Sequence, residues 1–303
     1  MNQTLTAVQA EGSQKGDAYY LVNGDGETVA FRKFAPERHK RKGLRRVLPQ
    51  GASGRHRRLA KEAFILNALQ QRDFQWLRTP AVLGRADNSL DLEYLPGRSL
   101  ETGEQLLAAR ALAELNATEL TEPMPVRRYL SLRLATTFTP FRKVTRIPRH
   151  LRDKCPNLAP PVQRAMWKLL RSQPARSPVL LNRDVHAKHF IVQDGGCAMV
   201  DFETSGLSRR WALLDIVCLA MEVSEELIDL DVLDAWLEVF RKGRSDWADM
   251  DLVAQLRFAM LYEEAVRVAA GSLEPERREL MEERLHFALK HDRVADFLGR
   301  RAA

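Results

Sequence analysis

Short apolar segments separated by turns dominate the first hundred residues of the chain. The segments rich in β-branched, aromatic and other apolar residues are LTAVQ (5–9), AYYLV (18–22), ETVAFRKF (27–34) and SLDLEYL (89–95). The NGDG sequence at 23–26 predicts a tight hairpin turn between the second and third of these segments. Apolar residues recur at helical spacing in RRLAKEAFILNALQ (57–70). The pattern therefore predicts a small sheet accompanied by one helix.

The rest of the chain is mainly helical in pattern. The clearest amphipathic helix is ETGEQLLAARALAELNATEL (101–120), and further helical segments continue toward the C-terminus. Between them, a polar turn at 181–190 leads into two short strands joined by a QDGG turn. We therefore expect an α+β fold of two lobes, with a β-rich lobe at 1–94, an α-rich lobe at 95–303 and a hinge near Tyr94–Gly97.

Composition is that of an ordinary globular protein, but positive charge is concentrated in two regions. The chain is 45% hydrophobic and 29% charged with a net charge of +7, which argues against global disorder. Residues 38–58 and 127–154 are both rich in Lys and Arg. Such regions attract phosphate-rich partners, although a solvated basic face would give the same pattern. The first region has no aromatic residues for stacking on bases, so no nucleic-acid partner is expected.

Cysteine usage and hydropathy both predict a cytoplasmic location. Cys155, Cys197 and Cys218 show no paired metal-binding spacing, which predicts buried thiols in a reducing compartment, without disulfide or zinc. The N-terminus has no basic region followed by an apolar run, so no signal peptide is expected. The most apolar stretch, WALLDIVCLAMEV (211–223), contains Asp215 and is too short to span a bilayer.

The stretch LNRDVHAKHFIV (181–192) carries the clearest candidate chemistry. Phosphoryl transfer needs a carboxylate that orients the attacking hydroxyl, groups that hold magnesium, a lysine on the phosphates and a glutamate that fixes this lysine. Asp184 occupies the position of the base in the kinase pattern H-R-D-L-x-x-x-N, and His189 stands where that pattern has the magnesium-binding Asn. Asp201 of the MVDFE stretch then corresponds to the magnesium ligand of D-F-G.

The β-rich lobe offers candidates for nucleotide binding. Gly12, Ser13 and Gly16 lie in EGSQKGD, a segment that is able to fold over phosphates but equally fits an ordinary hairpin loop. In VAFRKF, Lys33 is our choice for the phosphate-binding lysine. Arg32 is the competing choice, because strand alternation turns only one of the two toward the cleft.

Three further residues have open roles. Glu62, on the following helix, is placed to pair with Lys33 or to stand exposed on the helix surface. Tyr94 lies at the hinge and is a candidate contact for the nucleotide. His186 is more typical of a supporting or surface residue than of one with a direct role.

Taken together, these motifs resemble the lipopolysaccharide kinase family, bacterial enzymes with a protein-kinase-like fold. The resemblance runs from about residue 10 to about 220. It rests on RDVHAKHF, in which that family also has His instead of the kinase Asn, on VDFE, and on FRKF followed by the basic region and GRHRRLAKEAFIL. RRWALLDI resembles the family's segment after the magnesium-binding Asp.

The resemblance implies ATP and Mg²⁺ as cofactors and a role for each matching residue. Asp184 would orient the sugar hydroxyl as the base, Asp201 would be the main magnesium ligand, and His189 would be a second ligand or an orienting group. Lys33 and Glu62 would position the phosphates. Asp215 would hold the catalytic loop through backbone hydrogen bonds.

The implied function is phosphorylation of a heptose or Kdo hydroxyl of the lipopolysaccharide inner core. The partner would be the lipopolysaccharide core or its precursor, with peripheral contact between the 38–58 basic loop and the anionic inner membrane. The segment from Asp201 to Asp215 is short and lacks the A-P-E anchor, which disfavours a regulated protein kinase.

Two alternatives remain open at the level of the sequence. Small-molecule kinases acting on choline or aminoglycosides share the fold and bind cationic substrates in acidic pockets, for which the acidic stretch 222–251 would be available. A non-catalytic pseudokinase or a basic binding protein is the other, motivated by the missing Asn and the poorly matching glycine loop.

Overall fold

The computed structural model describes residues 5–9, 18–34, 54–86, 88–101, 103–120, 151–193, 195–223, 229–270, 275–293 and 297. Gly12, Ser13 and Gly16 lie outside the described residues, as do most of the 38–58 basic loop and most of the second basic region.

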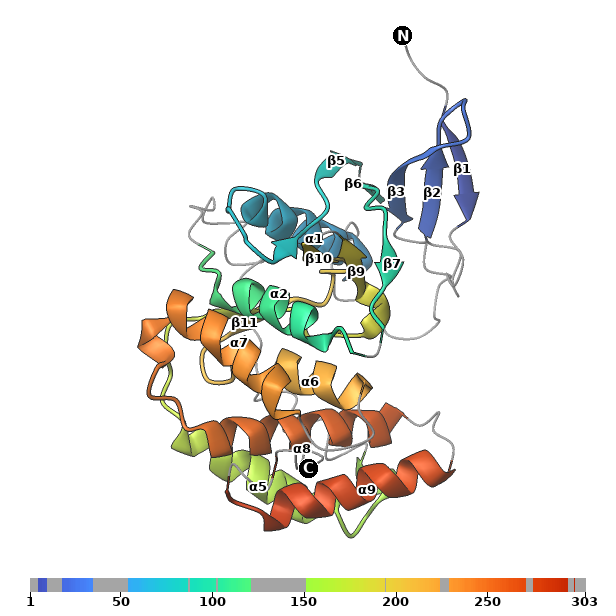
Figure 1. Ribbon diagram of the computed structural model, residues 1–303. Coiled ribbons are helices and arrows are strands. Elements are labelled where there is room, and N and C mark those ends of the chain that lie inside the picture. The colour runs from blue at the N-terminus through green and yellow to red at the C-terminus, as the bar shows by residue number, and fades with distance from the viewer. Residues whose placement is uncertain are drawn as a thin grey trace, which may run out of the picture.

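The N-terminal region forms a five-stranded antiparallel sheet with the order β1-β2-β3-β6-β5. Its strands are β1 (Thr6–Gln9), β2 (Ala18–Val22), β3 (Thr28–Phe34), β5 (Val82–Arg85) and β6 (Ser89–Glu93). The predicted hairpin turn between β2 and β3 is closed by Asn23, whose side-chain oxygen accepts hydrogen bonds from the backbone N–H of Asp25 at 3.0 Å and of Glu27 at 2.9 Å. Figure 1 shows this sheet at one end of the molecule.

The predicted N-terminal helix is α1 (Gly54–Leu69), which packs against β5 and β6. Its apolar positions Leu59, Ile65, Leu66 and Leu69 are buried, which fixes the helix against the sheet.

A second, four-stranded sheet connects the two regions and was not predicted from the sequence. Its order is β4-β10-β9-β7, with β4 (Leu77–Arg78), β7 (Arg98–Ser99), β9 (Phe190–Gln193) and β10 (Gly196–Met199). The antiparallel pair β9 and β10 confirms the strands expected around the QDGG turn. β4 and β7 have two residues each, too few for a periodic signal, and exist because β10 and β9 offer them pairing edges.

Gly97 shows how closely the hinge approaches this sheet. Its φ of +149° favours glycine, and a Cβ at this position would lie 2.5 Å from Cγ2 of Ile191 and 2.6 Å from the carbonyl oxygen of Val192. The Pro-Gly that ends the β6 segment in the sequence therefore serves close packing as well as strand termination.

The C-terminal region is a stack of helices around a buried centre (Figure 1). Its helices are α2 (Gln105–Ala117), α5 (Ala159–Ser172), α6 (Leu214–Val223), α7 (Leu230–Gly243), α8 (Leu252–Ala270) and α9 (Pro275–Lys290), and the short strands β8 (Val179–Leu181) and β11 (Gly206–Ser208) pair between them. Trp211 stacks on Phe258 at 3.8 Å, and the buried indole N–H of Trp236 donates to the side chain of Asn116. The expected α+β architecture is confirmed.

None of the helices in the described ranges is both long enough and apolar enough to cross a membrane. Most of the apolar stretch that contains Asp215 lies in the ten-residue helix α6, whose residues 214–221 are buried.

Candidate active site

The candidate catalytic loop follows the fully buried strand β8 and is anchored by Asp215. This residue lies in the first turn of α6 and is 1% exposed. Its carboxylate accepts hydrogen bonds from the backbone N–H of Asn182 at 2.7 Å and of Arg183 at 2.9 Å. Burial raises the pKa of Asp215, while these hydrogen bonds act in the opposite direction. The expected backbone contacts of Asp215 are therefore present.

Asn182 joins this loop to the segment around Asp201. Its side-chain nitrogen donates to the carbonyl oxygen of Asp201 at 2.8 Å, and its side-chain oxygen accepts from the backbone N–H of Asp184 at 3.1 Å. The hydroxyl of Thr204 donates to the Asn182 carbonyl at 2.8 Å. Asn182 stands where the kinase pattern H-R-D-L-x-x-x-N has its His, and this position alone gives no sign of the double link.

Asp184, His189 and Asp201 converge into one cluster. Each offers a potential metal ligand atom, and these atoms lie within 4.8 Å of one another. Asp184 comes from the loop after β8, His189 from the 3₁₀ turn before β9, and Asp201 from the segment that follows β10. The β9–β10 hairpin thus brings the residues of the two motifs to one place.

The hydrogen bond of His189 determines which ring nitrogen is available. Nδ1 lies 2.8 Å from the carbonyl oxygen of Asp184, and because a carbonyl only accepts, Nδ1 carries the proton. Nε2 then presents its lone pair, 3.7 Å from Oδ2 of Asp201. Burial lowers the pKa of His189, which favours the neutral ring. This tautomer is the one that coordinates a cation.

Lys33 lies between Glu62 and Asp201. Its Nζ is 2.7 Å from Oε1 of Glu62 and 3.1 Å from Oδ1 of Asp201. Glu62 is fully buried, and the same Oε1 accepts from the backbone N–H of Phe202 at 3.1 Å. Burial alone would lower the pKa of Lys33, but the two carboxylates outweigh it and raise the pKa above its usual value.

The register of β3 decides between the two candidate cations. Arg32 forms a bidentate pair with Asp91 of β6, with distances of 2.6 and 2.7 Å. Lys33 is consequently the residue turned toward the Asp201 cluster. The Lys33–Glu62 contact forms as expected, and Glu62 is buried instead of exposed.

His186 contacts the carboxylate of Asp184. Its Nε2 lies 3.2 Å from Oδ1 of Asp184, and its ring meets that of His189 edge to face at 5.3 Å. The contact with His186 lowers the pKa of Asp184, so this carboxylate is ionised at neutral pH. His186 therefore stands nearer to the chemistry than the sequence suggested.

Tyr94 follows β6 and is 36% exposed, with its ring packed edge to face on Tyr20 at 5.9 Å. The ring of Tyr94 thus packs against a residue of β2, and a contact with nucleotide stays a prediction.

Several acids of the 222–251 stretch are used in ion pairs outside the Asp184 cluster. Asp249 pairs with Arg176, and Glu238 of α7 pairs with Lys242. Arg244 is almost completely buried and pairs with Asp246 at 2.9 Å. These described carboxylates do not form an acidic pocket at the candidate catalytic loop.

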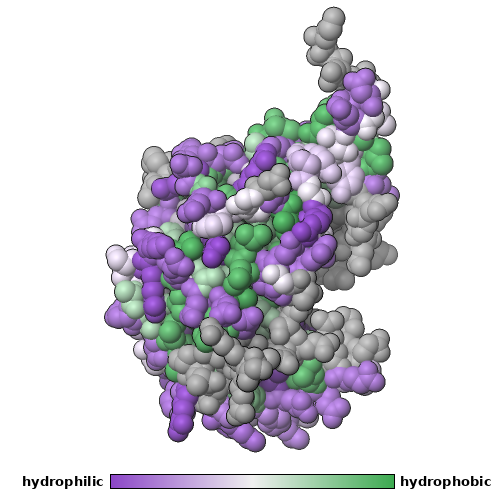
Figure 2. Space-filling view, in the orientation of Figure 1, coloured by the Kyte–Doolittle hydropathy of each residue, from purple (hydrophilic) through white to green (hydrophobic). Residues whose placement is uncertain are grey.

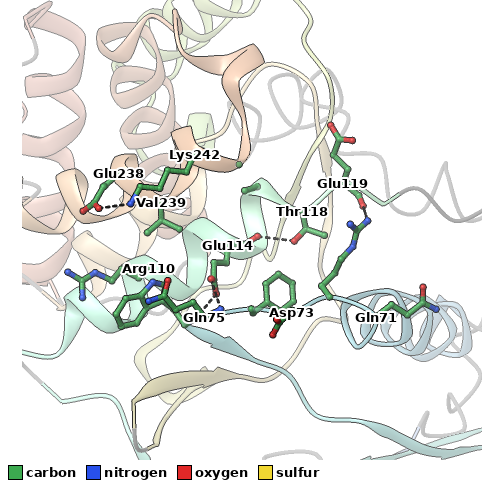
Figure 3. A pocket seen from close by; sticks show the side chains of 15 residues that line it. Gln71, Asp73, Gln75, Arg110, Glu114, Thr118, Glu119, Glu238, Val239 and Lys242 are labelled. Atoms are coloured by element: carbon green, nitrogen blue, oxygen red, sulfur yellow. Dashed lines mark hydrogen bonds and ion pairs between the residues drawn. The ribbon is translucent and has the colours of Figure 1, made fainter.

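A cavity of about 1080 Å³ lies between the loop before β4, α2 and α7 (Figure 3). Arg110 covers the ring of Trp76 at 4.7 Å, and Glu114 accepts hydrogen bonds from three successive backbone N–H groups, those of Gln75, Trp76 and Leu77. None of the three residues of the Asp184 cluster lines this cavity. Its walls are formed by the loop before β4, by α2, whose Glu114 holds this loop in place, and by α7.

Solved structures with a similar fold include kinases with three kinds of substrate. The aminoglycoside phosphotransferase APH(2'')-Ib, in its ADP-bound form, is 14% identical with a TM-score of 0.57, covering 98% of this chain and 95% of that one. The macrolide 2'-phosphotransferase MphH from Brachybacterium faecium is 14% identical with a TM-score of 0.52, covering 93% and 92%. The choline kinase LicA from Streptococcus pneumoniae is 12% identical with a TM-score of 0.58, covering 95% and 94%. At these identities the likeness shows the fold.

Comparison of the sequence with known protein families identifies the family of this chain. No curated protein shows significant sequence similarity to it. The model of the phosphotransferase enzyme family matches residues 6–253, a span that contains Lys33, Glu62 and the Asp184 cluster. The kinase-like fold implied by the lipopolysaccharide kinase resemblance is confirmed, whereas that particular group of kinases is not singled out. The chain belongs to the phosphotransferase enzyme family.

Proposed function

We propose that the protein transfers the γ-phosphoryl group of ATP to a hydroxyl group of a small organic molecule, in a Mg²⁺-dependent reaction. The observation that carries this proposal is the convergence of Lys33, Asp184, His189 and Asp201 from separate elements onto one site. Membership of a phosphotransferase family supplies the reaction class. A pseudokinase reading is disfavoured because the lysine and both aspartates are present and correctly ordered.

The side chains divide the chemistry between them. Lys33, fixed by Glu62, is placed to bind phosphate oxygens, and its raised pKa keeps it charged. Asp184, whose pKa is lowered by its contact with His186, is the group that would accept a hydrogen bond from the attacking hydroxyl and orient it. Such positioning and charge stabilisation account for most of the catalysis of phosphoryl transfer.

The donor set fits a divalent cation. The carboxylate of Asp201 supplies oxygen atoms of the kind that Mg²⁺ prefers, and Nε2 of His189 presents a lone pair toward this carboxylate. Imidazole is an unusual ligand for Mg²⁺, so Asp201 would be the main ligand of the ion, His189 would be a weaker ligand or an orienting group, and Asp184 would be left to orient the hydroxyl. A bound ion would neutralise phosphate charge during transfer.

We take a small-molecule alcohol as the main acceptor class. Solved structures of this fold include kinases named for aminoglycosides, macrolides and choline, and each of these acceptors carries a free hydroxyl. Three acids of the 222–251 stretch, Glu238, Asp246 and Asp249, are engaged in ion pairs outside the Asp184 cluster and give no support for a strongly cationic acceptor.

A second candidate acceptor is a heptose or Kdo sugar of the lipopolysaccharide inner core. The observations that favour it are the RDVHAKHF motif and the basic regions 38–58 and 127–154, which suit an anionic acceptor or membrane surface. Under this candidate, neutralising Arg41, Lys42, Arg45 and Arg46 would weaken association with anionic vesicles at low salt. Unchanged association would remove membrane contact from the proposal.

The direct test is an acceptor panel read by mass spectrometry. Purified protein and Mg-ATP are incubated with an aminoglycoside, a macrolide, choline and dephosphorylated lipopolysaccharide core. A mass gain of one phosphate on one acceptor supports the function, and fragmentation locates the hydroxyl. A protein that binds no Mg-ADP and phosphorylates none of the panel would contradict it.

A further inference from the structure

One face of α1 is attached to the segment that follows Asp201. Arg58, Lys61 and Glu62 share this face because residues three and four positions apart are neighbours on a helix. Arg58 pairs with Glu203 at 3.1 Å, and Nζ of Lys61 donates to the carbonyl oxygen of Ser205 at 2.6 Å. With the contact between Glu62 and the N–H of Phe202, the helix contacts three of the four residues after Asp201.

Lys61 occupies an unfavourable place for a cation. It is only 5% exposed, and Arg58 and Arg183 add positive charge nearby. Burial, followed by these like charges, lowers the pKa of Lys61 to about 8. The lysine bears this desolvation cost at the position where its Nζ meets the carbonyl oxygen of the fully buried Ser205.

The backbone at Asp201 needs external support. Its φ of +65° is uncommon for a residue other than glycine, and such a conformation persists where the surroundings hold it. On one side, Asn182 donates to the carbonyl of Asp201. On the other, Glu62 holds the N–H of Phe202 and Lys61 holds the carbonyl of Ser205.

We propose that Lys61 is a positioning residue for phosphoryl transfer. Lys61 fixes the Phe202–Ser205 turn on α1. This attachment keeps Glu62 in contact with Lys33 and holds Asp201 in the cluster with Asp184 and His189. The Arg58–Glu203 pair supports the same attachment at the surface. In regulated protein kinases, phosphorylation of the activation loop orders the segment that follows the magnesium-binding Asp. In this chain, the carbonyl of Ser205 and the carboxylate of Glu203 hold the turn on α1 instead, so the turn is positioned without phosphorylation.

The role rests on the proposed function and is tested by a double-mutant cycle. The variants are Lys61→Met, Glu62→Gln and their combination, and the readouts are Mg-ADP affinity by calorimetry and the rate of Mg-ATP hydrolysis or transfer. We expect Lys61→Met to lower the affinity or the rate about tenfold in the wild-type background and less than about twofold in the Glu62→Gln background. Lys61→Arg, which keeps a donor and a charge, should recover most of the loss.

The controls separate positioning from folding. Lys168→Met changes an exposed lysine on α5 and should leave both readouts unchanged. If Lys61→Met does not fold, judged by its unfolding temperature, Arg58→Gln tests the same attachment from an exposed position and should give a smaller loss that also disappears in the Glu62→Gln background.

The possible failures are distinguishable. A wild-type protein without Mg-ADP binding would overturn the proposed function. Wild-type binding together with a folded Lys61→Met variant of unchanged affinity and rate, or with equal losses in both backgrounds, would overturn the positioning role alone.

Discussion

At the scale of single residues, β3 presents two adjacent cations with different tasks. Arg32 is paired with Asp91 across the sheet, whereas Lys33 contacts Glu62 and Asp201. The sequence favoured Lys33 and kept Arg32 as the competing choice, because alternation says only that the two side chains point to opposite faces. In the structure, Arg32 pairs with Asp91 of β6, and Lys33 is therefore the side chain that faces the Asp201 cluster.

We expect Lys33→Met to lower Mg-ADP affinity by at least about tenfold, because a charged contact to the phosphates is lost. Arg32→Met is the matched control one position away. It removes a partly exposed pair and should lower the free energy of unfolding by no more than about 1 kcal/mol while leaving affinity unchanged. Calorimetric titration of both variants is the measurement, and equal losses of affinity would contradict the assignment.

His189 should make nucleotide binding sensitive to acid. Its folded-state pKa lies below 6.5, so the unfolded chain takes up its proton first, and the stability contributed by the neutral ring is lost as pH falls through the folded pKa. Protonation also removes the Nε2 lone pair from the cluster. Mg-dependent ADP affinity should therefore be flat above about pH 6.5 and fall below it.

His189→Asn replaces the titrating ring by an oxygen donor that Mg²⁺ prefers. This variant should keep Mg-dependent binding and show a flatter pH profile between about pH 5 and 7. An identical acid dependence in the variant and the wild type would show that another group is responsible.

At the scale of elements, helix α6 anchors the catalytic loop through Asp215. Asp215 holds two backbone N–H groups of the catalytic loop, and Asp215→Ala would leave the buried N–H of Asn182 and the partly buried N–H of Arg183 without this acceptor. We expect the free energy of unfolding to fall by about 2–4 kcal/mol, measured by urea denaturation. Asp153→Asn, at an exposed position, is the control, and a loss below about 0.5 kcal/mol in Asp215→Ala would refute the anchoring role.

Gly97 offers a matched pair of glycine substitutions. Gly97→Ala combines a positive φ with contacts to Ile191 and Val192 that are too close for a methyl group, so it should be destabilising by about 1–3 kcal/mol. Gly24→Ala has open space around it and should change thermal stability little. Similar unfolding temperatures for the two variants would contradict the close approach of hinge and sheet.

The long elements were predictable because their periods are local. The strands AYYLV and ETVAFRKF, the NGDG turn and the helix around AFIL all appear where the pattern placed them. The two-residue strands β4 and β7 were not predictable, since they depend on edges provided by residues a hundred positions away. Lys61 was missed for a related reason, because helical spacing does not reveal that a polar position faces a carbonyl of another segment.

At the scale of the whole molecule, the order of the motifs along the chain carried most of the functional information. Each motif was weak alone, but together they specified a kinase-like fold, which the family match and the similar structures confirm. The acceptor was not specified, because it depends on the shape and charge of a pocket formed by distant segments. The resemblance to lipopolysaccharide kinases therefore remains one candidate beside small-molecule alcohols.

The central claim is that the Asp184 cluster performs phosphoryl transfer, and Asp184→Asn tests it most directly. Mg-ADP affinity and the rate of transfer, with water as acceptor until the panel identifies another, are measured on the variant and on the wild type. The account predicts affinity within about threefold of the wild type and a rate lowered by at least about a hundredfold. A folded variant that transfers phosphate at the wild-type rate, or that no longer binds Mg-ADP, would contradict it.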